Sequence, residues 1–506
     1  MTTSHPRSSA RSPDAELATD HLIADIGRRS RYGGAVLLGA QALRVVGQMA
    51  TLIVLARLLS PSAFGLLAMV AAVGLILDLV KEFGLSAATI QKQDITHAQV
   101  SALFWINAAV GIFMTLLLFA AAPLLAHFYD QPELLDVTRC LAPAFAISGL
   151  TVQHWALLRR QMRFVAVAGL ETAADIAGFA TAIGLAVAGY GYWALVAQRL
   201  VSPTLLLVGS WLICRWRPAP PAPTAGLRAL LGFGASVTGS GLAIAFARSI
   251  DQILIGWLWG PALLGLYERT TRLLLLPVNA INAPVYAAAM PALSRLVDQP
   301  VRYRAMFIQV VQKLALLTMP AFALAAVTSD WIVAILFGPS WLQAIPLVTL
   351  FSLSAIHLPV LLAVALLYMT QARTGELLRA SLIDAAVCVV AILVGLRYGP
   401  VGVAAALALV GFLVRLPMAF WLAARRGPVS TSLIWRAIAP PASAAAAVAL
   451  AVWQLRELVL RQAEPTIFGI AVTATTALVV TTLTLLVWPE TRRELRGALH
   501  RRAVLV

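Results

Sequence analysis

Charged side chains interrupt long apolar segments of this sequence. If those segments span a membrane, an ionisable group inside one is costly, so it marks a pathway or pairs with another charge. Arginine keeps its charge and offers a planar fork that binds phosphate oxygens bidentately. The candidate anion ligands are four arginines that lie in three of these apolar segments: Arg44, Arg248, Arg269 and Arg272.

Acidic residues and one lysine in the same segments are candidates for carrying a coupling ion or for gating. They are Asp78, Lys81, Glu82, Asp251 and Asp384. The first three are spaced i, i+3 and i+4, which places them on one face of a helix. Further intramembrane charges are Glu171, Asp175, Glu268, Lys313 and Arg415.

The same charges have a structural interpretation as ion pairs within one helix. Spacings of three or four residues suit such pairs. Three pairs have this spacing: Asp78 with Lys81, Arg248 with Asp251, and Glu268 with Arg272. Arg44 has no acidic residue within helical reach. A purely structural role is therefore harder to assign to Arg44 than to the other arginines.

The composition places these charges in a membrane protein. Hydrophobic residues make up 60% of the 506 residues and charged residues 12%, about half of what a soluble domain carries. The net charge of +16 fits basic cytoplasmic loops. Nucleic-acid binding is disfavoured because no basic domain lies outside the apolar segments. The three scattered cysteines indicate neither a disulfide frame nor a metal site.

The apolar segments predict an all-α polytopic protein of about fourteen transmembrane helices, each needing about 20 apolar residues. The expected spans are 32–58, 62–90, 98–126, 134–157, 164–188, 191–214, 227–257, 261–292, 304–328, 341–370, 377–397, 400–424, 431–454 and 466–488.

The loops between these spans alternate in charge, which predicts the topology. The basic set holds Lys92; Arg159, Arg160 and Arg163; Arg215, Arg217 and Arg228; Arg295, Arg302 and Arg304; Arg373 and Arg379; and Arg425, Arg426 and Arg436. Both tails are basic as well, and positive residues mark the cytoplasmic side. We expect an even number of spans, both termini in the cytoplasm, and an uncleaved N-terminal tail.

One turn occurs twice, 200 positions apart. Residues 55–69 read LARLLSPSAFGLLAM and residues 255–269 read IGWLWGPALLGLYER. The matched residues are Leu58, Pro61, Gly65 and Leu66 with Leu258, Pro261, Gly265 and Leu266. A second pair of similar segments is YGYWALVA at 190–197 and YGPVGVAA at 398–405. Such internal symmetry is common in transporters.

The repeat predicts the domain organisation. Six spans per repeat is an even number, so the lobes should be parallel repeats about a pseudo-two-fold axis along the membrane normal. The predicted parts are a cytoplasmic tail (1–31), an N-terminal six-helix lobe (32–214), a Pro-rich cytoplasmic linker (215–226), a C-terminal six-helix lobe (227–424), two additional helices (425–488) and a basic cytoplasmic tail (489–506).

Several stretches of the chain resemble the polysaccharide or O-antigen (Wzx-type) flippases of the multidrug/oligosaccharidyl-lipid/polysaccharide exporter superfamily. They are RSIDQILIG (248–256), WGPALLGLYERTTRLLLLP (259–277), LARLLSPSAFGLLAM (55–69) and EFGLSAATIQ (82–91). The resemblance covers most of residues 32–425. It implies two six-helix bundles that open alternately to each side of the bacterial inner membrane, and an undecaprenyl-diphosphate-linked oligosaccharide as substrate.

This resemblance implies that the arginines bind the diphosphate of the substrate, because a diphosphate that crosses hydrocarbon needs cations to replace its lost water. Polysaccharide polymerase and export machinery are further expected partners. We expect no cofactor, no metal and no enzymatic activity. Within the superfamily, a lipid II flippase or a cation-coupled drug antiporter remains open. A membrane polysaccharide polymerase or ligase is the alternative of another class, but the predicted external loops are short and poor in histidine.

The topology is testable by labelling single cysteines in whole cells. A cysteine at position 130 should react with a membrane-impermeant reagent added outside, because its loop is acidic. A cysteine at position 160 should react only after the membrane is permeabilised. The reverse pattern would contradict the predicted orientation.

Overall fold

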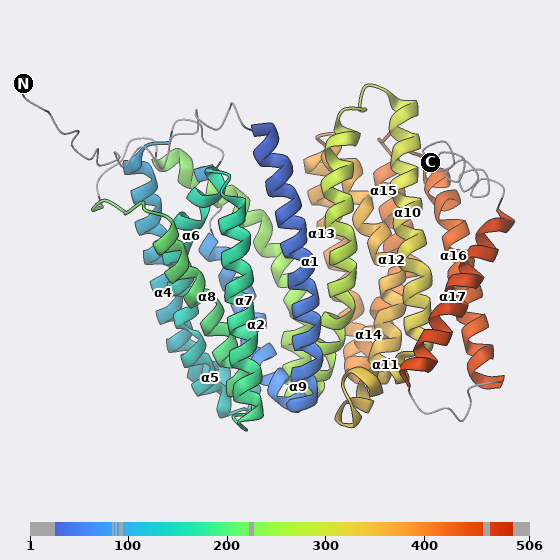
Figure 1. Cartoon of the computed structure of the whole chain (residues 1–506), viewed down its shortest axis with the longest axis horizontal. Helices are drawn as coiled ribbons and strands as arrows, with labels where there is room; N and C mark the ends of the chain where they lie inside the picture. Colours follow the sequence, from blue (N-terminus) through green and yellow to red (C-terminus); the bar gives the residue numbers. More distant parts are fainter. Residues whose placement is uncertain are drawn as a thin grey trace, which may run out of the picture. The chain divides into compact units, whose positions relative to one another are not determined.

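The computed structural model confirms the all-α prediction. It describes residues 26–82, 86, 89–90, 95–221, 227–458 and 466–488. Within these ranges, only the backbone is described for residues 26–38, 78–82, 227–248 and 467. Helices and turns account for the regular structure of these ranges (Figure 1). The chain forms two compact units: Met1–Thr51 with Met69–Ser249, and Leu52–Ala68 with Ile250–Val506. We call them unit 1 and unit 2.

Unit 1 is a bundle of antiparallel helices. Two helices run from one unit into the other, α1 (Ile26–Leu58) and α2 (Pro61–Glu82). The others are α4 (His97–Tyr129), α5 (Glu133–Leu141), α6 (Pro143–Arg160), α7 (Phe164–Val187) and α8 (Trp193–Ile213). Helix α4 packs on α6, and α8 packs on both α6 and α7. In Figure 1 these helices run side by side.

Unit 2 contains more helices, and α9 (Leu227–Ser294) enters it from unit 1. The remaining helices are α10 (Pro300–Val327), α11 (Ser329–Leu336), α12 (Ile345–Thr370), α13 (Thr374–Gly395), α14 (Gly399–Val410), α15 (Leu416–Ala424), α16 (Thr431–Leu458) and α17 (Ile467–Val487). Short turns of 3₁₀ helix lie at Pro339–Ala344 and Leu396–Tyr398, and a π-helical turn at Gly411–Arg415.

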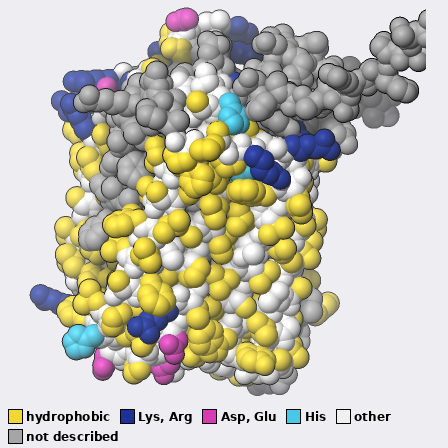
Figure 2. All heavy atoms as spheres, turned by 90° about the vertical axis from the view of Figure 1, so that its left-hand side faces the viewer, with side chains coloured by type: hydrophobic (Ala, Val, Ile, Leu, Met, Phe, Trp, Pro, Cys, Tyr) yellow, Lys and Arg dark blue, Asp and Glu magenta, His cyan; other side chains and the backbone are white. Residues whose placement is uncertain are grey.

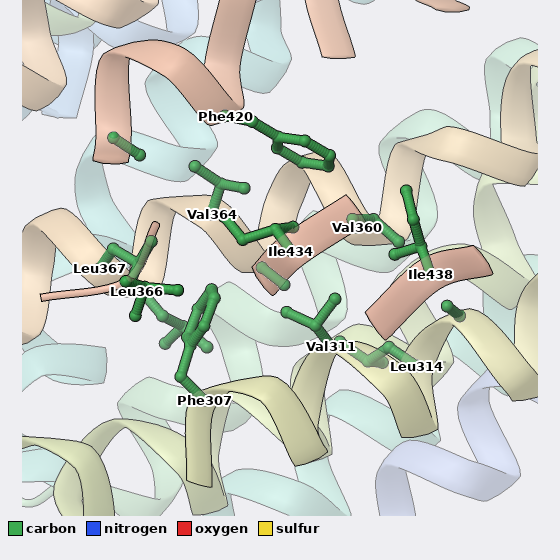
Figure 3. Close-up of a cluster of buried hydrophobic side chains, with 14 of the residues drawn as sticks. Phe307, Val311, Leu314, Val360, Val364, Leu366, Leu367, Phe420, Ile434 and Ile438 are labelled. Carbon is green, nitrogen blue, oxygen red and sulfur yellow. The ribbon is translucent and has the colours of Figure 1, made fainter. Parts of the chain in front are cut away.

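Among the described residues, a large buried core of unit 2 lies where α10, α12, α15 and α16 meet (Figure 3). Phe307 and Val311 of α10 belong to one cluster with Val364 of α12. Phe420 of α15 and Ile434 of α16 belong to the same cluster. Each of these side chains is almost fully buried. Helix α16, the first of the two additional predicted helices, is thus packed into the core of unit 2.

Long apolar helices make this a multi-pass membrane protein. Eleven stretches of the described residues are long and apolar enough to cross a membrane. Thr374–Ala424 is 51 residues long and covers two predicted spans. Ser249–Ser294 is 46 residues long and covers one predicted span and the end of the one before it, and Pro61–Leu77 is a shorter apolar helix. The count of fourteen therefore stays a prediction.

The surface of unit 1 has the character of a lipid-facing surface. Leu116 and Leu124 of α4 are 62% and 68% exposed. Figure 2 shows a face whose middle is covered by apolar side chains, while arginine, lysine, acidic and histidine side chains gather toward its two ends. Exposed apolar area on this scale marks a surface that contacts something other than water.

Local sequence signals explain where helices begin. Helix α4 begins with a capping box, in which Thr96 accepts a hydrogen bond from the amide of Gln99 and the Gln99 side chain accepts one from Thr96. Such a box satisfies two of the free amides of a helix N-terminus. Helices α2 and α10 instead begin with proline, whose missing N–H costs nothing there.

The first part of the predicted linker lies against unit 1. The amide of Ala219 donates to Oγ of Ser101 at 3.0 Å, and the indole N–H of Trp105 donates to the Ala219 carbonyl at 2.7 Å. Residues 222–226 of the linker lie outside the described residues. Residues 215–221, before them, are not helical.

A hairpin of the first repeat, Leu52–Ala68, belongs to unit 2. The indole N–H of Trp341 donates to the Ala56 carbonyl at 2.7 Å, and the guanidinium of Arg57 donates to the carbonyls of Ile335 and Leu336. Phe64 packs on the ring of Trp341, with 5.5 Å between the ring centroids. One buried hydrogen bond, two exposed ones and aromatic packing together hold this hairpin against the rest of unit 2.

The two matched turns cross each other inside unit 2. Gly260 has φ +75°, which breaks α9 before Pro261, just as α1 ends at Leu58 before Pro61 begins α2. A Cβ atom built on Gly65 would overlap the carbonyl of Pro261, and one built on Gly265 would overlap the carbonyl of Pro61. This reciprocal contact is what a local two-fold relation between the turns produces.

The crossing predicts that glycine is required at both positions. We expect Gly65→Ala and Gly265→Ala each to lower the free energy of unfolding by about 1–3 kcal/mol, because the added methyl group overpacks a backbone contact. Gly169→Ala is the matched control, because a Cβ there meets nothing within 4 Å. Thermal unfolding of the purified protein measures the difference. Equal stability of all three variants would contradict the close crossing.

Candidate functional site

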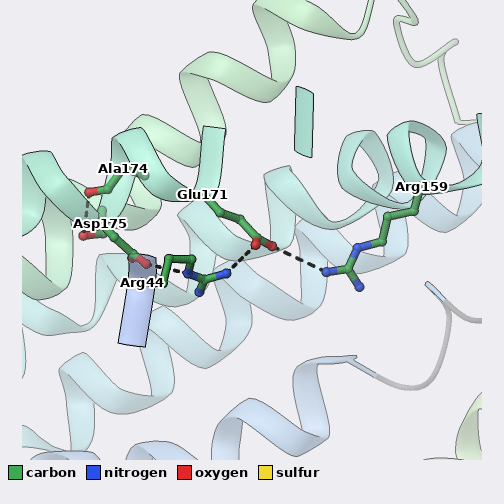
Figure 4. Close-up of polar contacts among 6 residues, drawn as sticks. Arg44, Arg159, Glu171, Ala174 and Asp175 are labelled. Atoms are coloured by element: carbon green, nitrogen blue, oxygen red, sulfur yellow. Dashed lines mark hydrogen bonds and ion pairs between the residues drawn. The ribbon is translucent and has the colours of Figure 1, made fainter. Parts of the chain in front are cut away.

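Arg44 is held by two carboxylates from one helix, α7 (Figure 4). Its Nε lies 2.9 Å from Oδ2 of Asp175, and its Nη1 contacts Oε2 of Glu171. The other oxygen of Glu171 lies 3.6 Å from Nη2 of Arg159, at the end of α6. We call these four residues of unit 1 the Arg44 cluster. It contains two cations and two anions.

Helix geometry explains how α7 presents both acids to Arg44. Glu171 and Asp175 are four residues apart and therefore lie on the same helix face. Asp175 falls near the middle of the 24-residue helix α7, which is membrane depth for a spanning helix. The side chain of Arg44 remains 26% exposed, and those of Glu171 and Asp175 remain 19% and 23% exposed. The cluster is thus shielded but reachable by a ligand.

Sequence reasoning named Arg44, Glu171 and Asp175 as intramembrane charges and Arg159 as a loop residue, but it did not find their pairing. Arg44 and its acids are 127 and 131 positions apart, and no local spacing rule connects residues that distant. The i, i+4 spacing of Glu171 and Asp175 was the available signal, because two like charges on one helix face repel unless a cation lies between them.

The arginines of the second repeat have different surroundings. Arg272 lies 3.6 Å from Glu268, which is the ion pair that their spacing predicts. Arg269 is buried, and its guanidinium carbon lies 3.6 Å from the ring centroid of Phe64, a cation–π contact. Arg272 keeps 44% of its side chain exposed. Arg269 thus braces the Leu52–Ala68 hairpin, while Arg272 is open to a ligand.

Asp251 lies in a partly buried polar pair. The hydroxyl of Tyr267 donates to its Oδ2 at 2.8 Å, and the amide of Gln252 donates to its Oδ1 at 2.8 Å. The side chain of Arg248 lies outside the described residues, so its predicted pairing with Asp251 stays a prediction. The side chains of Asp78, Lys81 and Glu82 also lie outside them.

Asp384 of α13 makes a bidentate ion pair. Its two carboxylate oxygens lie 2.7 and 2.8 Å from Nε and Nη2 of Arg415. Arg415 ends the π-helical turn Gly411–Arg415, a local irregularity that is frequent at functional sites. Because both oxygens of Asp384 are occupied, this carboxylate has little capacity left to bind a free cation.

Two uncharged polar side chains of α6 are packed in place. His154 is buried and stacked on Trp211, with 4.4 Å between ring centroids. Gln153 is buried and accepts a hydrogen bond from Thr89 at 2.9 Å. Within the described residues, no three acidic, histidine or cysteine side chains gather as a metal site would require.

Comparisons with known proteins agree with these features. A family model described as polysaccharide biosynthesis protein matches residues 54–346, more than half of the chain. The teichuronic acid biosynthesis protein TuaB of Bacillus subtilis is 30% identical over 285 residues, which are 55% of this chain and 58% of TuaB. The succinoglycan biosynthesis transport protein ExoT of Rhizobium meliloti is 28% identical over 60% of this chain and 62% of ExoT. The matches thus span less than two thirds of either relative.

Among solved structures, the chain is similar to the lipid II flippase MurJ in an inward closed conformation. The TM-score is 0.71, at 10% identity, over 90% of this chain and 98% of MurJ. At this identity the likeness shows the fold alone. It confirms the expectation of an exporter-type helical fold and carries no argument about the substrate.

The Asp384–Arg415 pair predicts a specific pattern of stability. Arg415→Ala should lower the free energy of unfolding by about 3 kcal/mol, because it leaves a shielded carboxylate without its partner. The double variant Asp384→Ala/Arg415→Ala should be more stable than Arg415→Ala alone, because it leaves no unpaired charge. Thermal unfolding in detergent compares them. A double variant that is less stable than Arg415→Ala would contradict this account.

Proposed function

Because the chain belongs to the family of polysaccharide biosynthesis proteins, we propose that it is a flippase for undecaprenyl-diphosphate-linked oligosaccharides. It moves the repeat units across the bacterial inner membrane for exopolysaccharide or O-antigen synthesis. A relative described as a biosynthesis transport protein supports this proposal, as do the many membrane-length helices. Both termini lie in the cytoplasm.

The observation that carries the proposal is Arg44, a partly exposed cation that pairs with Asp175 near the middle of the apolar helix α7. A guanidinium at this depth replaces the water that a diphosphate sheds on entering the membrane. Arg272 is the second proposed ligand of the diphosphate, because its side chain is exposed. Arg248 is a further ligand, and Arg269 supports the site through its contact with Phe64.

Transport proceeds by alternating access without nucleotide hydrolysis. The sequence contains no Gly-x-x-x-x-Gly-Lys phosphate loop, so an ion gradient, the membrane potential or consumption of the product drives the reaction. Asp251 is the favoured carrier of a coupling ion, because its partners are a hydroxyl and an amide. Asp78, Lys81 and Glu82 remain gating candidates. Asp384 is less suited, because Arg415 already neutralises it.

The alternatives are less well supported. The likeness to MurJ is one of fold, so it does not favour lipid II over another lipid-linked sugar. A cation-coupled drug antiporter would not need arginine ligands for a diphosphate. A membrane polymerase or ligase is disfavoured by the transport description of a relative. The proposed function is therefore transport, with the polymerase acting as a separate partner.

Substitution of Arg44 tests the proposal. Reconstituted in proteoliposomes, the protein should move a fluorescent prenyl-diphosphate sugar across the bilayer. Arg44→Ala should lose about tenfold or more of this rate, because one charge-assisted bidentate contact is worth about 1.5–3 kcal/mol. Arg44→Lys should recover part of it, because lysine keeps the charge and loses the fork.

The control is Arg302→Ala, an exposed arginine whose side chain bonds to Gln299, and it should keep the rate. Folding of every variant is checked by its elution as a single species after purification. A fully active Arg44→Ala protein would show that the diphosphate does not bind at Arg44.

A further inference from the structure

We infer that unit 2 binds the phosphate group of an anionic phospholipid at the place where α13 begins and α15 ends. The binding groups are the guanidiniums of Arg379 and Arg426, which both attract the same carboxylate, Glu376. We call these three residues, together with Arg373, the Glu376 site. The inference is independent of the proposed function, because its ligand is a lipid of the surrounding bilayer and not the transported molecule.

The Glu376 site holds more cations than anions. Arg373 pairs with Glu376 through two hydrogen bonds, 2.7 Å from Nη2 to Oε2 and 3.3 Å from Nε to Oε1. Nη1 of Arg426 lies 3.8 Å from Oε1, and Arg379 follows Glu376 by three residues on the same face of α13. Three guanidinium groups and one carboxylate leave two positive charges in excess. The site therefore attracts a further anion.

Arg373 is the shielded member of the site and has a structural role. Its side chain is 12% exposed and donates to the Ala423 carbonyl at 3.2 Å, and its guanidinium carbon lies 5.2 Å from the ring centroid of Tyr368. These contacts fasten the start of α13 to the end of α15. The side chain of Arg426, by contrast, is 67% exposed, and Arg379 is exposed as well. The excess positive charge is thus carried by the two arginines that a ligand can reach.

Exposed apolar side chains continue from the arginines toward the middle of both helices. Leu382 and Ile383 follow Arg379 by three and four residues on the same side of α13, and both are exposed. On α15, Trp421 is exposed, and the guanidinium carbon of Arg425 lies 5.3 Å from its ring centroid. Because α13 begins and α15 ends here, the apolar residues of both helices lie deeper than the arginines. A charged end followed by apolar surface matches a phospholipid, whose phosphate lies above its acyl chains.

This combination favours an anionic phospholipid over other ligands. A phosphate group accepts charge-assisted hydrogen bonds from two guanidiniums at once, and basic pockets between membrane helices bind anionic headgroups. A zwitterionic headgroup brings its own cation close to Arg379 and Arg426, so it gains less from the excess positive charge. A soluble phosphate uses the charges but leaves the apolar surface beside them uncovered.

The test measures the affinity of the purified full-length protein for dioleoylphosphatidylglycerol and for dioleoylphosphatidylcholine. Native mass spectrometry of the detergent-solubilised protein gives the dissociation constant of the first bound lipid. The wild-type protein should bind phosphatidylglycerol about tenfold more tightly than phosphatidylcholine. Arg379→Gln and Arg426→Gln should each weaken the binding of phosphatidylglycerol about fivefold, which is what one arginine contributes near a membrane surface.

Three further variants separate the site from overall charge. Arg302→Gln is the matched control, because Arg302 is exposed at the same end of unit 2, where the hydroxyl of the neighbouring Tyr303 lies 2.6 Å from that of Thr370 at the end of α12. It removes one positive charge outside the Glu376 site and should leave the affinity for phosphatidylglycerol unchanged. Arg426→Lys keeps the charge and should keep most of the affinity. Glu376→Gln should tighten the binding, because it adds one unit to the positive excess.

Two results would overturn the inference. One is equal affinity of the wild-type protein for the two lipids. The other is an Arg302→Gln protein that loses as much affinity as Arg379→Gln and Arg426→Gln, because binding would then follow overall charge and not the site.

A competitor distinguishes a lipid from a soluble anion. Glycerol phosphate has the phosphate group without acyl chains, so it should not displace phosphatidylglycerol from the wild-type protein. Displacement at equal concentration would show that the site binds soluble phosphate, which contradicts the inference. All of these measurements are made without transport, so their outcome is separate from that of the proposed function.

Discussion

Charge inside hydrocarbon is the constraint on which the organisation of this protein depends. Within the described residues, the intramembrane arginines whose contacts are seen lie against carboxylates or an aromatic ring. Arg44 has two carboxylates from α7, Arg415 has one from α13, and Arg269 covers the ring of Phe64. Each arrangement lowers the cost of a guanidinium in lipid, and each leaves a different capacity for binding a further anion.

The same constraint separates structural charges from functional ones. A bidentate pair such as Asp384–Arg415 satisfies the geometry of both partners, so neither is free for a substrate or an ion. Glu268 cannot neutralise Arg269 and Arg272 together, and Arg272 remains exposed. Arg44 is neutralised yet reachable. A transporter for an anionic lipid needs cations that are stable without substrate and available to it, and the Arg44 cluster meets both requirements.

Close backbone contacts also join the two copies of the repeated turn. Gly65 and Gly265 lie against the carbonyls of Pro261 and Pro61, so the two matched turns approach more closely than side chains would permit. Small residues allow such approach in membrane proteins, where packing rather than the hydrophobic effect holds helices together. Trp341 and Arg57 add hydrogen bonds to the same hairpin. The repeated motif is therefore a contact between the two copies as well as a trace of internal symmetry.

The sequence by itself determined the class of the protein, the two matched turns and the ion pair of Glu268 with Arg272, because apolar length, proline position and i, i+4 spacing are local properties of a chain. It also identified Arg44, Glu171 and Asp175 as charges inside apolar segments. Only the tertiary structure decided that Arg44 pairs with Glu171 and Asp175, that Arg415 neutralises Asp384, and that the two glycine turns face each other. These contacts join residues 31 to about 200 positions apart. Helix packing decides which distant faces meet, and no periodicity within a single helix encodes that choice.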